Sequence, residues 1–168
     1  RDYALDKHKT VDDTPYGGGN GMIMKADVLA SSLDANIKSG EKTIYLSPRG
    51  KVFNSKLARE FSSERSINLI CGHFEGVDER VIQSRNIEEV SIGDFVLSGG
   101  ESAAFAFIDS ILRFIPGILG NASSSEDESF ENGLLEYPQF TKPQVWEEKT
   151  VPDVLLSGDH AKIKDWRL

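Results

Sequence analysis

Three segments of this 168-residue chain place glycines beside polar or acidic side chains, directly after short apolar runs. They are residues 47–50 (Ser-Pro-Arg-Gly), 72–78 (Gly-His-Phe-Glu-Gly-Val-Asp) and 91–101 (Ser-Ile-Gly-Asp-Phe-Val-Leu-Ser-Gly-Gly-Glu). Because glycine has no Cβ, backbone amides in such loops can approach a ligand closely. Any one of the segments taken alone is more typical of a tight turn. Three of them at one edge of one sheet favour a ligand pocket.

The glycine spacing excludes two common nucleotide-phosphate motifs. A dinucleotide-binding loop needs G-x-G-x-x-G, but residues 17–19 (Gly-Gly-Gly) are followed by Met22 at the place of the third glycine. A P-loop needs G-x-x-x-x-G-K-[ST], but residues 50–51 (Gly-Lys) are followed by Val52. The pocket is therefore not predicted to bind phosphate through either motif.

The elements that would position these loops alternate between strand and helix. The spacing of apolar residues predicts strands over residues 43–47, 67–71, 89–92 and 95–97. It predicts helices over residues 25–39, from Asn54 or Ser55 through Phe61, over 79–85 after an Asp78 cap, and over 101–114. Gly40 is expected to close the first helix, and Pro116-Gly117 to end the last. Such alternation predicts an α/β fold with a mainly parallel sheet and ligand loops at the carboxyl ends of its strands.

The composition changes after this alternating region. Residues 121–129 (Asn-Ala-Ser-Ser-Ser-Glu-Asp-Glu-Ser) are small, polar and acidic, which is typical of a linker. We therefore expect a sheet domain over residues 1–119, a linker over 120–131 and part of a second domain over 132–168.

The two ends of the chain differ in character. Residues 1–21 are polar and end in a glycine-rich stretch, so they are predicted to form a loop. Residues 130–151 are rich in proline and aromatic side chains and are expected to form an ordered loop. A final helix is predicted to begin at Ser157 or Asp159.

Composition and charge narrow the functional class. Cys71 is the only cysteine, which excludes an intrachain disulfide and a cysteine zinc cluster, and His8, His73 and His160 are too scattered for a metal set. There is no apolar run long enough for a membrane span and no signal-peptide core, so we expect a soluble, cytoplasmic protein. The formal net charge of −8 argues against nucleic-acid binding unless basic residues cluster locally.

Five longer motifs point to a known family. Residues 12–22, 45–48, 71–80, 91–101 and 113–117 resemble, in order and spacing, the TrmD-type bacterial tRNA (guanine-N1)-methyltransferases. The resemblance implies a SPOUT-class fold with a deep trefoil knot that holds S-adenosylmethionine. It also implies a homodimer with the active site at the subunit interface, and a tRNA substrate with guanine at position 37. A further strand segment before Arg1 and a small helical, tRNA-binding C-terminal domain are implied as well.

The resemblance also implies which residues hold the cofactor. These residues are Tyr45, Leu46, Ser47, Pro48, Gly72, Glu75, Ile92, Gly93, Asp94, Phe95, Val96, Leu97, Gly99 and Gly100. From the sequence alone, the apolar members Leu46, Ile92 and Leu97 are more typical of a hydrophobic core.

Methylation of guanine N1 needs two catalytic functions. The N1 proton must be removed as the methyl group arrives, and negative charge that builds on O6 must be stabilised, so a general base and a cationic donor are required. Arg113 matches the family's arginine for the second task. An ion pair with Asp109, four residues earlier on the same predicted helix, is an alternative role for Arg113.

The general base is ambiguous in the sequence. The family's base is an aspartate directly before Ser-Phe, whereas here Glu128 stands directly before Ser129-Phe130 and Asp127 lies one place earlier. Both acids are candidates, although a solvated acidic linker is the commoner meaning of such a run. Asp12 matches a family position near the target base, but it also fits a simple turn. The family uses Mg²⁺, for which Glu75 is a plausible oxygen ligand.

Two other functions stay open at the level of sequence. One is a SPOUT methyltransferase that acts on another base or on ribose, with the same knot loops. The other is a non-catalytic RNA-binding module, which the acidic composition favours slightly and the retained glycine loops disfavour.

Overall fold

The computed structural model describes residues 1–118 and 137–168. The chain divides into two compact units, residues 1–120 and residues 121–168. We describe each unit by itself.

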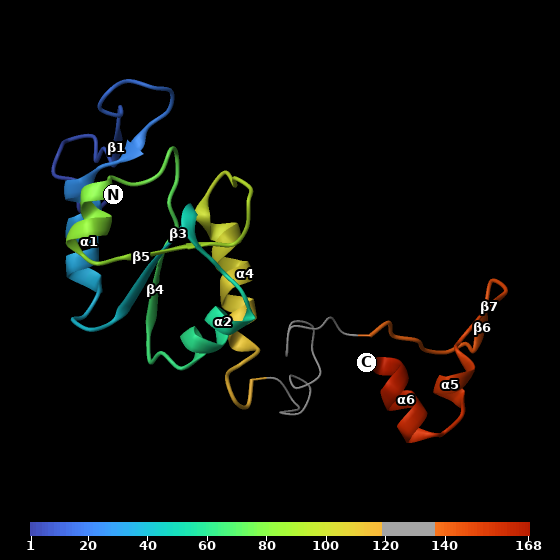
Figure 1. Cartoon of the computed structure of the whole chain (residues 1–168). Helices are drawn as coiled ribbons and strands as arrows, with labels where there is room; N and C mark the ends of the chain where they lie inside the picture. Colours follow the sequence, from blue (N-terminus) through green and yellow to red (C-terminus); the bar gives the residue numbers. More distant parts are fainter. Residues whose placement is uncertain (119–136) are drawn as a thin grey trace. The chain divides into compact units, whose positions relative to one another are not determined.

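A three-stranded parallel sheet forms the centre of the first unit (Figure 1). Its strand order is β4 (Ile67–Ile70), β3 (Lys42–Val52), β5 (Glu88–Ser91). The central strand β3 contains a continuous apolar run, and Ile44 and Tyr45 within it are both buried, as expected for a strand covered on both faces. The predicted α/β architecture with a parallel sheet is confirmed.

Four helices flank the sheet in two pairs. Helices α1 (Ala26–Asn36) and α3 (Glu79–Ser84) contact each other, as do α2 (Ser55–Ser62) and α4 (Gly100–Leu112). The predicted caps are present: the Asn54 side chain accepts a hydrogen bond from the Leu57 amide at 2.9 Å, and Asp78 accepts one from the Arg80 amide at 3.0 Å.

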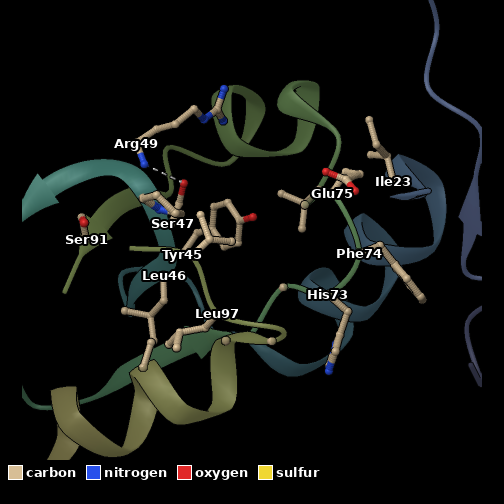
Figure 2. Close-up of a pocket in the computed structure, with 18 of the residues that line it drawn as sticks. Ile23, Tyr45, Leu46, Ser47, Arg49, His73, Phe74, Glu75, Ser91 and Leu97 are labelled. Atoms are coloured by element: carbon tan, nitrogen blue, oxygen red, sulfur yellow. Dashed lines mark hydrogen bonds between the residues drawn. The ribbon is translucent and has the colours of Figure 1, made fainter. Parts of the chain in front are cut away.

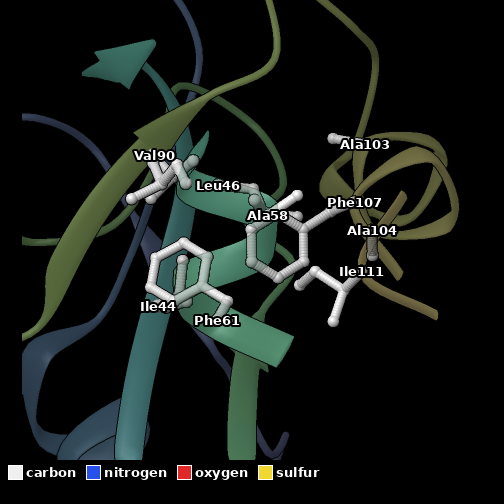
Figure 3. Close-up of a cluster of buried hydrophobic side chains, with 10 residues drawn as sticks. Ile44, Leu46, Ala58, Phe61, Val90, Ala103, Ala104, Phe107 and Ile111 are labelled. Atoms are coloured by element: carbon white, nitrogen blue, oxygen red, sulfur yellow. The ribbon is translucent and has the colours of Figure 1, made fainter. Parts of the chain in front are cut away.

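Side chains of β3 alternate between two hydrophobic clusters, one with each helix pair. Ile44 and Leu46 pack with α2 and α4, whereas Tyr45 packs with α1 and α3. Figure 3 shows the first cluster, in which Phe107 of α4 lies against Phe61 of α2 with 5.4 Å between ring centroids. This alternation is the period-two pattern of a strand with a core on each side.

The structure corrects the prediction that β3 ends at Ser47. The strand continues to Val52, and Leu46 and Lys51 both pair with Val90, so residues 47–50 leave the sheet and return to it. We call residues 47–50 the β3 excursion. Gly50 is needed where the strand returns, because a Cβ there would lie 2.3 Å from the Val90 backbone nitrogen.

The predicted strand over residues 95–97 is also wrong. These residues belong to a loop between β5 and α4, and Phe95 and Val96 are 52% and 84% exposed. The reason is a turn at Gly93, whose φ of 152° lies in the region that favours glycine, with the Phe95 amide donating to the Gly93 carbonyl at 3.0 Å. The β-prone side chains therefore find no partner strand.

Smaller features also differ from the prediction. Helix α1 ends at Asn36 rather than Ser39, because Ile37 is already extended, and Gly40 lies in the turn that follows. Helix α4 ends at Leu112, before the proline that was expected to stop it. The N-terminal loop contains a two-residue strand, β1 (Asp12–Asp13), which pairs with β2 (Ile23–Met24).

The described part of the second unit, residues 137–168, holds a small hairpin and two helices. Strands β6 (Val145–Trp146) and β7 (Lys149–Thr150), which were not predicted, pair antiparallel. Helix α5 (Asp153–Leu156) follows. The final helix, α6 (His160–Arg167), is capped by the Asp159 side chain, which accepts a hydrogen bond from the Lys162 amide at 3.2 Å. Asp159 was one of the two predicted starting points of this helix.

Aromatic side chains of the described part of the second unit pack on one another. The Trp166 ring lies 6.4 Å from Tyr137 and 6.1 Å from Phe140, measured between centroids. The Arg167 guanidinium lies 4.5 Å from the Tyr137 ring centroid. Among the described residues of both units, no helix is both long and apolar enough to cross a membrane.

Candidate active site

The three glycine-bearing segments meet around a cavity of about 610 Å³ (Figure 2). The β3 excursion forms one side, residues 72–78 after β4 form the second, and residues 91–100 after β5 form the third. The first interrupts β3, and the other two follow β4 and β5. The carboxyl edge of the parallel strands is where ligands bind in open α/β sheets. The sequence-based expectation that these loops line one pocket is confirmed.

Tyr45 lies at the junction of the first and second sides. Its ring packs under Gly72, where an added Cβ would lie 2.8 Å from the ring, and under Gly76, where one would lie 3.1 Å from the hydroxyl. Burial raises the pKa of the Tyr45 hydroxyl, and the nearby Glu89 carboxylate adds to this rise. Tyr45 therefore stays neutral and acts as a rigid polar wall of the pocket.

The second side is held in place by the N-terminal segment. The Glu75 amide donates to the Met22 carbonyl at 2.9 Å, and the Met24 amide donates to the Gly76 carbonyl at 2.9 Å. Phe74, at the tip, has a φ of 59°, which is uncommon for a bulky residue. Its side chain is 55% exposed and points away from the centre of the pocket in Figure 2.

The third side is fixed by short-range hydrogen bonds and by close packing. Ser91 is buried, and its hydroxyl accepts a hydrogen bond from the Gly93 amide at 3.2 Å. At the far end, the Gly100 amide donates to the Gly72 carbonyl at 3.0 Å, and a Cβ on Gly100 would lie 2.6 Å from the Cys71 Cα. The absence of a Cβ at Gly100 therefore allows two protein segments to pack closely, in addition to any role in letting a ligand approach the backbone.

Two half-exposed side chains bridge the second and third sides. His73 Nε2 lies 3.0 Å from the Glu101 carboxylate in the first turn of α4. In Figure 2 the His73 ring points away from the pocket centre, toward the side opposite Tyr45. The two loops are thus joined at the pocket mouth by a polar contact and by the Gly100–Gly72 hydrogen bond.

The first side carries an arginine that the sequence did not single out. The Arg49 Nη2 atom lies 2.8 Å from Glu79 of α3 and 3.2 Å from Glu89 of β5. The Arg49 hydrogen bond is the main reason why the pKa of Glu79 is lowered. Tyr16 and Ile23 of the N-terminal segment also line the pocket and were missed, because nothing in their spacing links them to the glycine loops.

Most of the residues expected to hold a cofactor lie on the pocket wall. All of them line it except Asp94, whose neighbours Gly93 and Phe95 do. The apolar residues Leu46, Ile92 and Leu97 are among the lining residues; Leu46 and Ile92 also pack with the core, whereas Leu97 does not.

The two described residues expected to act in catalysis, Arg113 and Asp12, do not line this pocket. Arg113 is exposed at the carboxyl end of α4, whereas the pocket lies at the amino end of that helix. A 13-residue helix at about 1.5 Å per residue separates them by roughly 20 Å. Asp12 lies in β1 opposite Met24 and does not line the pocket. Asp127 and Glu128 lie outside the described residues.

A metal cluster is also not formed by the described residues. In residues 1–118 and 137–168, no group of three or more histidine, cysteine, aspartate or glutamate side chains could hold a metal ion. Glu75 lines the pocket, but without such a group around it.

The fold and the cavity define an α/β protein with a loop-lined pocket at the carboxyl edge of a parallel sheet. The chain belongs to the TrmD family of tRNA (guanine-1)-methyltransferases, whose profile matches residues 1–168. The resemblance inferred from the motifs is thereby confirmed.

Several relatives are similar over the whole chain. The tRNA (guanine-N(1)-)-methyltransferase of Pelagibacter ubique (strain HTCC1062) is 71% identical over 168 residues, which cover 100% of this chain and 74% of that protein. The enzyme of the same name from Bartonella quintana (strain Toulouse) is 55% identical over 99% of this chain and 72% of its own length. That of Brucella canis is 52% identical over 100% of this chain and 68% of its own length.

Proposed function

We propose that this protein transfers a methyl group from S-adenosylmethionine to N1 of guanine 37 in tRNA, next to the anticodon. The observation that carries the proposal is the family match over residues 1–168, with relatives of up to 71% identity that are tRNA (guanine-N(1)-)-methyltransferases. The protein would work in the cytoplasm, where tRNA is modified.

The pocket suits S-adenosylmethionine. Its volume of about 610 Å³ lies within the roughly 300–1,000 Å³ typical of small-molecule sites. Leu46, Ile92 and Leu97 offer an apolar surface for adenine, while backbone groups of the three loops offer hydrogen-bond partners for its edge. Bound S-adenosylmethionine would supply the methyl group, and the residues of the chain would orient it and exclude water.

The proposed chemistry assigns one role to each catalytic residue. Arg113 stabilises the negative charge that develops on guanine O6. Asp127 or Glu128 accepts the N1 proton. Asp12 lies near the target base.

The active site is proposed to form between two copies of the chain. Arg113 lies roughly 20 Å along α4 from the pocket of its own chain, so a site that uses both is more simply assembled from two chains. Helix α4 also exposes Phe105 and Ile108, which are 77% and 44% accessible and lie three residues apart on one helix face. We propose that the protein is a homodimer.

The remaining proposals concern the fold and the domains. The SPOUT trefoil knot is proposed from the family match alone. Residues 1–119 would form the methyltransferase domain, 120–131 the linker and 132–168 the start of a helical tRNA-binding domain. Helix α6 carries Lys162, Lys164 and Arg167, which could contact phosphates. Mg²⁺ stays a prediction that rests on the family resemblance alone.

The position of the target base can be tested with labelled S-adenosylmethionine and two tRNA transcripts that differ only at position 37. We expect the full-length protein to methylate the transcript with guanine 37 and to leave the transcript with adenine 37 unlabelled. Equal labelling of both transcripts would contradict the assignment of position 37. Cofactor binding without labelling of either transcript would favour a non-catalytic RNA-binding module.

A further inference from the structure

We propose that Arg49 is a positioning residue that holds the β3 excursion in its cofactor-binding shape by bridging Glu79 and Glu89. The inference rests on the proposed function, because it concerns the binding of S-adenosylmethionine to this pocket. It assigns a role to a side chain that neither the sequence motifs nor the catalytic chemistry accounted for.

The β3 excursion is held by few contacts of its own. Residues 47–50 lie between two residues, Leu46 and Lys51, that both pair with Val90, so the excursion has no partner strand. One end is set by the close packing of Gly50 on the β5 backbone. Within the excursion, the Arg49 amide donates to the Ser47 hydroxyl at 3.3 Å (Figure 2).

Arg49 ties this excursion to the elements that carry the other two sides of the pocket. Glu79 is the first residue of α3, directly after the 72–78 loop, and Glu89 lies in β5, shortly before the 91–100 loop. The Arg49 side chain extends from the excursion toward α3 in Figure 2, at one edge of the pocket. One guanidinium therefore links all three segments, at 2.8 Å to Glu79 and 3.2 Å to Glu89.

The chemistry of arginine suits this task. Its planar guanidinium presents several N–H donors in a fixed geometry and can engage two carboxylates at once, whereas a lysine ammonium is a flexible point charge. The hydrogen bond to Glu79 and the charge of Glu89 raise the pKa of Arg49. The Glu89 side chain is only 22% exposed, so this arm of the bridge is partly shielded from solvent.

The effect should appear in ligand binding more than in overall stability. Arg49 is 63% exposed, and ion pairs of this kind contribute little to folding. The apparent affinity of a ligand, however, falls in proportion to the fraction of molecules in the binding-competent state. An excursion that is released from Glu79 and Glu89 would adopt that state for less of the time.

A second ion pair in the same sheet provides a matched control. Lys42 and Glu88 also link β3 to β5, but at the starts of the two strands, and neither residue lines the pocket. Their side chains are 34% and 31% exposed, which makes them at least as buried as Arg49. Loss of that pair tests whether any broken link between the two strands disturbs the pocket.

The experiment compares wild type, Arg49→Gln, Arg49→Lys and Lys42→Gln in the full-length protein, by calorimetric titration with S-adenosylmethionine. For Arg49→Gln we expect the Kd to rise about five- to tenfold, as it would if the competent fraction fell to about 10–20%. Arg49→Lys should give a smaller rise, and Lys42→Gln no rise. The KM for the cofactor should rise by a larger factor than kcat falls.

Hydrogen exchange of the protein without ligand gives a readout that does not depend on activity. The amides of Ser47 and of residues 49–51 should exchange faster in Arg49→Gln than in wild type, while those of α4 stay protected. An unchanged Kd and unchanged exchange in Arg49→Gln would overturn the inference, as would an equal loss of affinity in Lys42→Gln. If wild type itself failed to bind S-adenosylmethionine, the proposed function would fail first.

Discussion

Replacing Arg113 with alanine is expected to lower the single-turnover rate of tRNA methylation by about 10²–10³-fold, the usual cost of losing a donor to a developing oxyanion. The Kd for S-adenosylmethionine should change little, because Arg113 lies at the end of α4 opposite to the pocket of its own chain. The measurement is the rate at saturating cofactor and tRNA, together with a separate cofactor titration.

Arg59→Ala is a suitable control for this experiment. Arg59 is an exposed arginine whose guanidinium lies 4.6 Å from the ring of Phe114, the residue next to Arg113. We expect its removal to leave the methylation rate close to that of wild type. A loss of rate in Arg59→Ala as large as in Arg113→Ala would show that the helix end, rather than the O6 donor, had been disturbed.

The second large effect is expected in the acidic run that contains Asp127 and Glu128. Of Asp127→Ala and Glu128→Ala, one should lower the methylation rate by about 10²–10⁴-fold, the usual contribution of a general base. The other should retain most of the activity, because only one carboxylate can be placed beside N1. The measurement is again the single-turnover rate, with both variants still able to bind S-adenosylmethionine.

Glu126→Ala serves as the control for the charge of this acidic run. It removes the same negative charge from the same acidic run but is not a candidate base. If all three variants lost activity equally, the role would belong to the charge of the acidic run as a whole. If neither Asp127→Ala nor Glu128→Ala lost activity, the proton would have to be accepted elsewhere.

The sheet, the helices and the pocket edge were predictable from local patterns. Short β-prone runs around Ile44 and Ile70 alternate with helical periodicity, and this alternation leads to parallel strands whose carboxyl ends share one edge. The Asn54 and Asp78 caps were predictable because a short polar side chain directly before a helical segment satisfies free amides.

The strand that was wrongly predicted over residues 95–97 shows where such patterns fail. Phe95, Val96 and Leu97 look like a strand because they are β-prone and apolar, but they face a pocket and solvent instead of a core. Periodicity records that a side chain is apolar and does not distinguish a ligand surface from a packed interior. The continuation of β3 past Pro48 was missed for a similar reason, because a proline in a strand pattern usually marks its end.

The Arg49 bridge and the position of Arg113 required the structure. Glu79 and Glu89 are 30 and 40 residues from Arg49 in sequence, so no local pattern connects the three. The catalytic role proposed for Arg113 rests on family resemblance alone, and the structure adds that one chain does not bring Arg113 to its own pocket.

The measurement that tests the central claim most directly is the identity of the methylated nucleoside. Unmodified tRNA would be incubated with the full-length protein and labelled S-adenosylmethionine, digested to nucleosides and separated by chromatography with mass detection. N1-methylguanosine as the single labelled nucleoside is the result expected here. Label on ribose or on another base would contradict the claim and would indicate a different RNA methyltransferase.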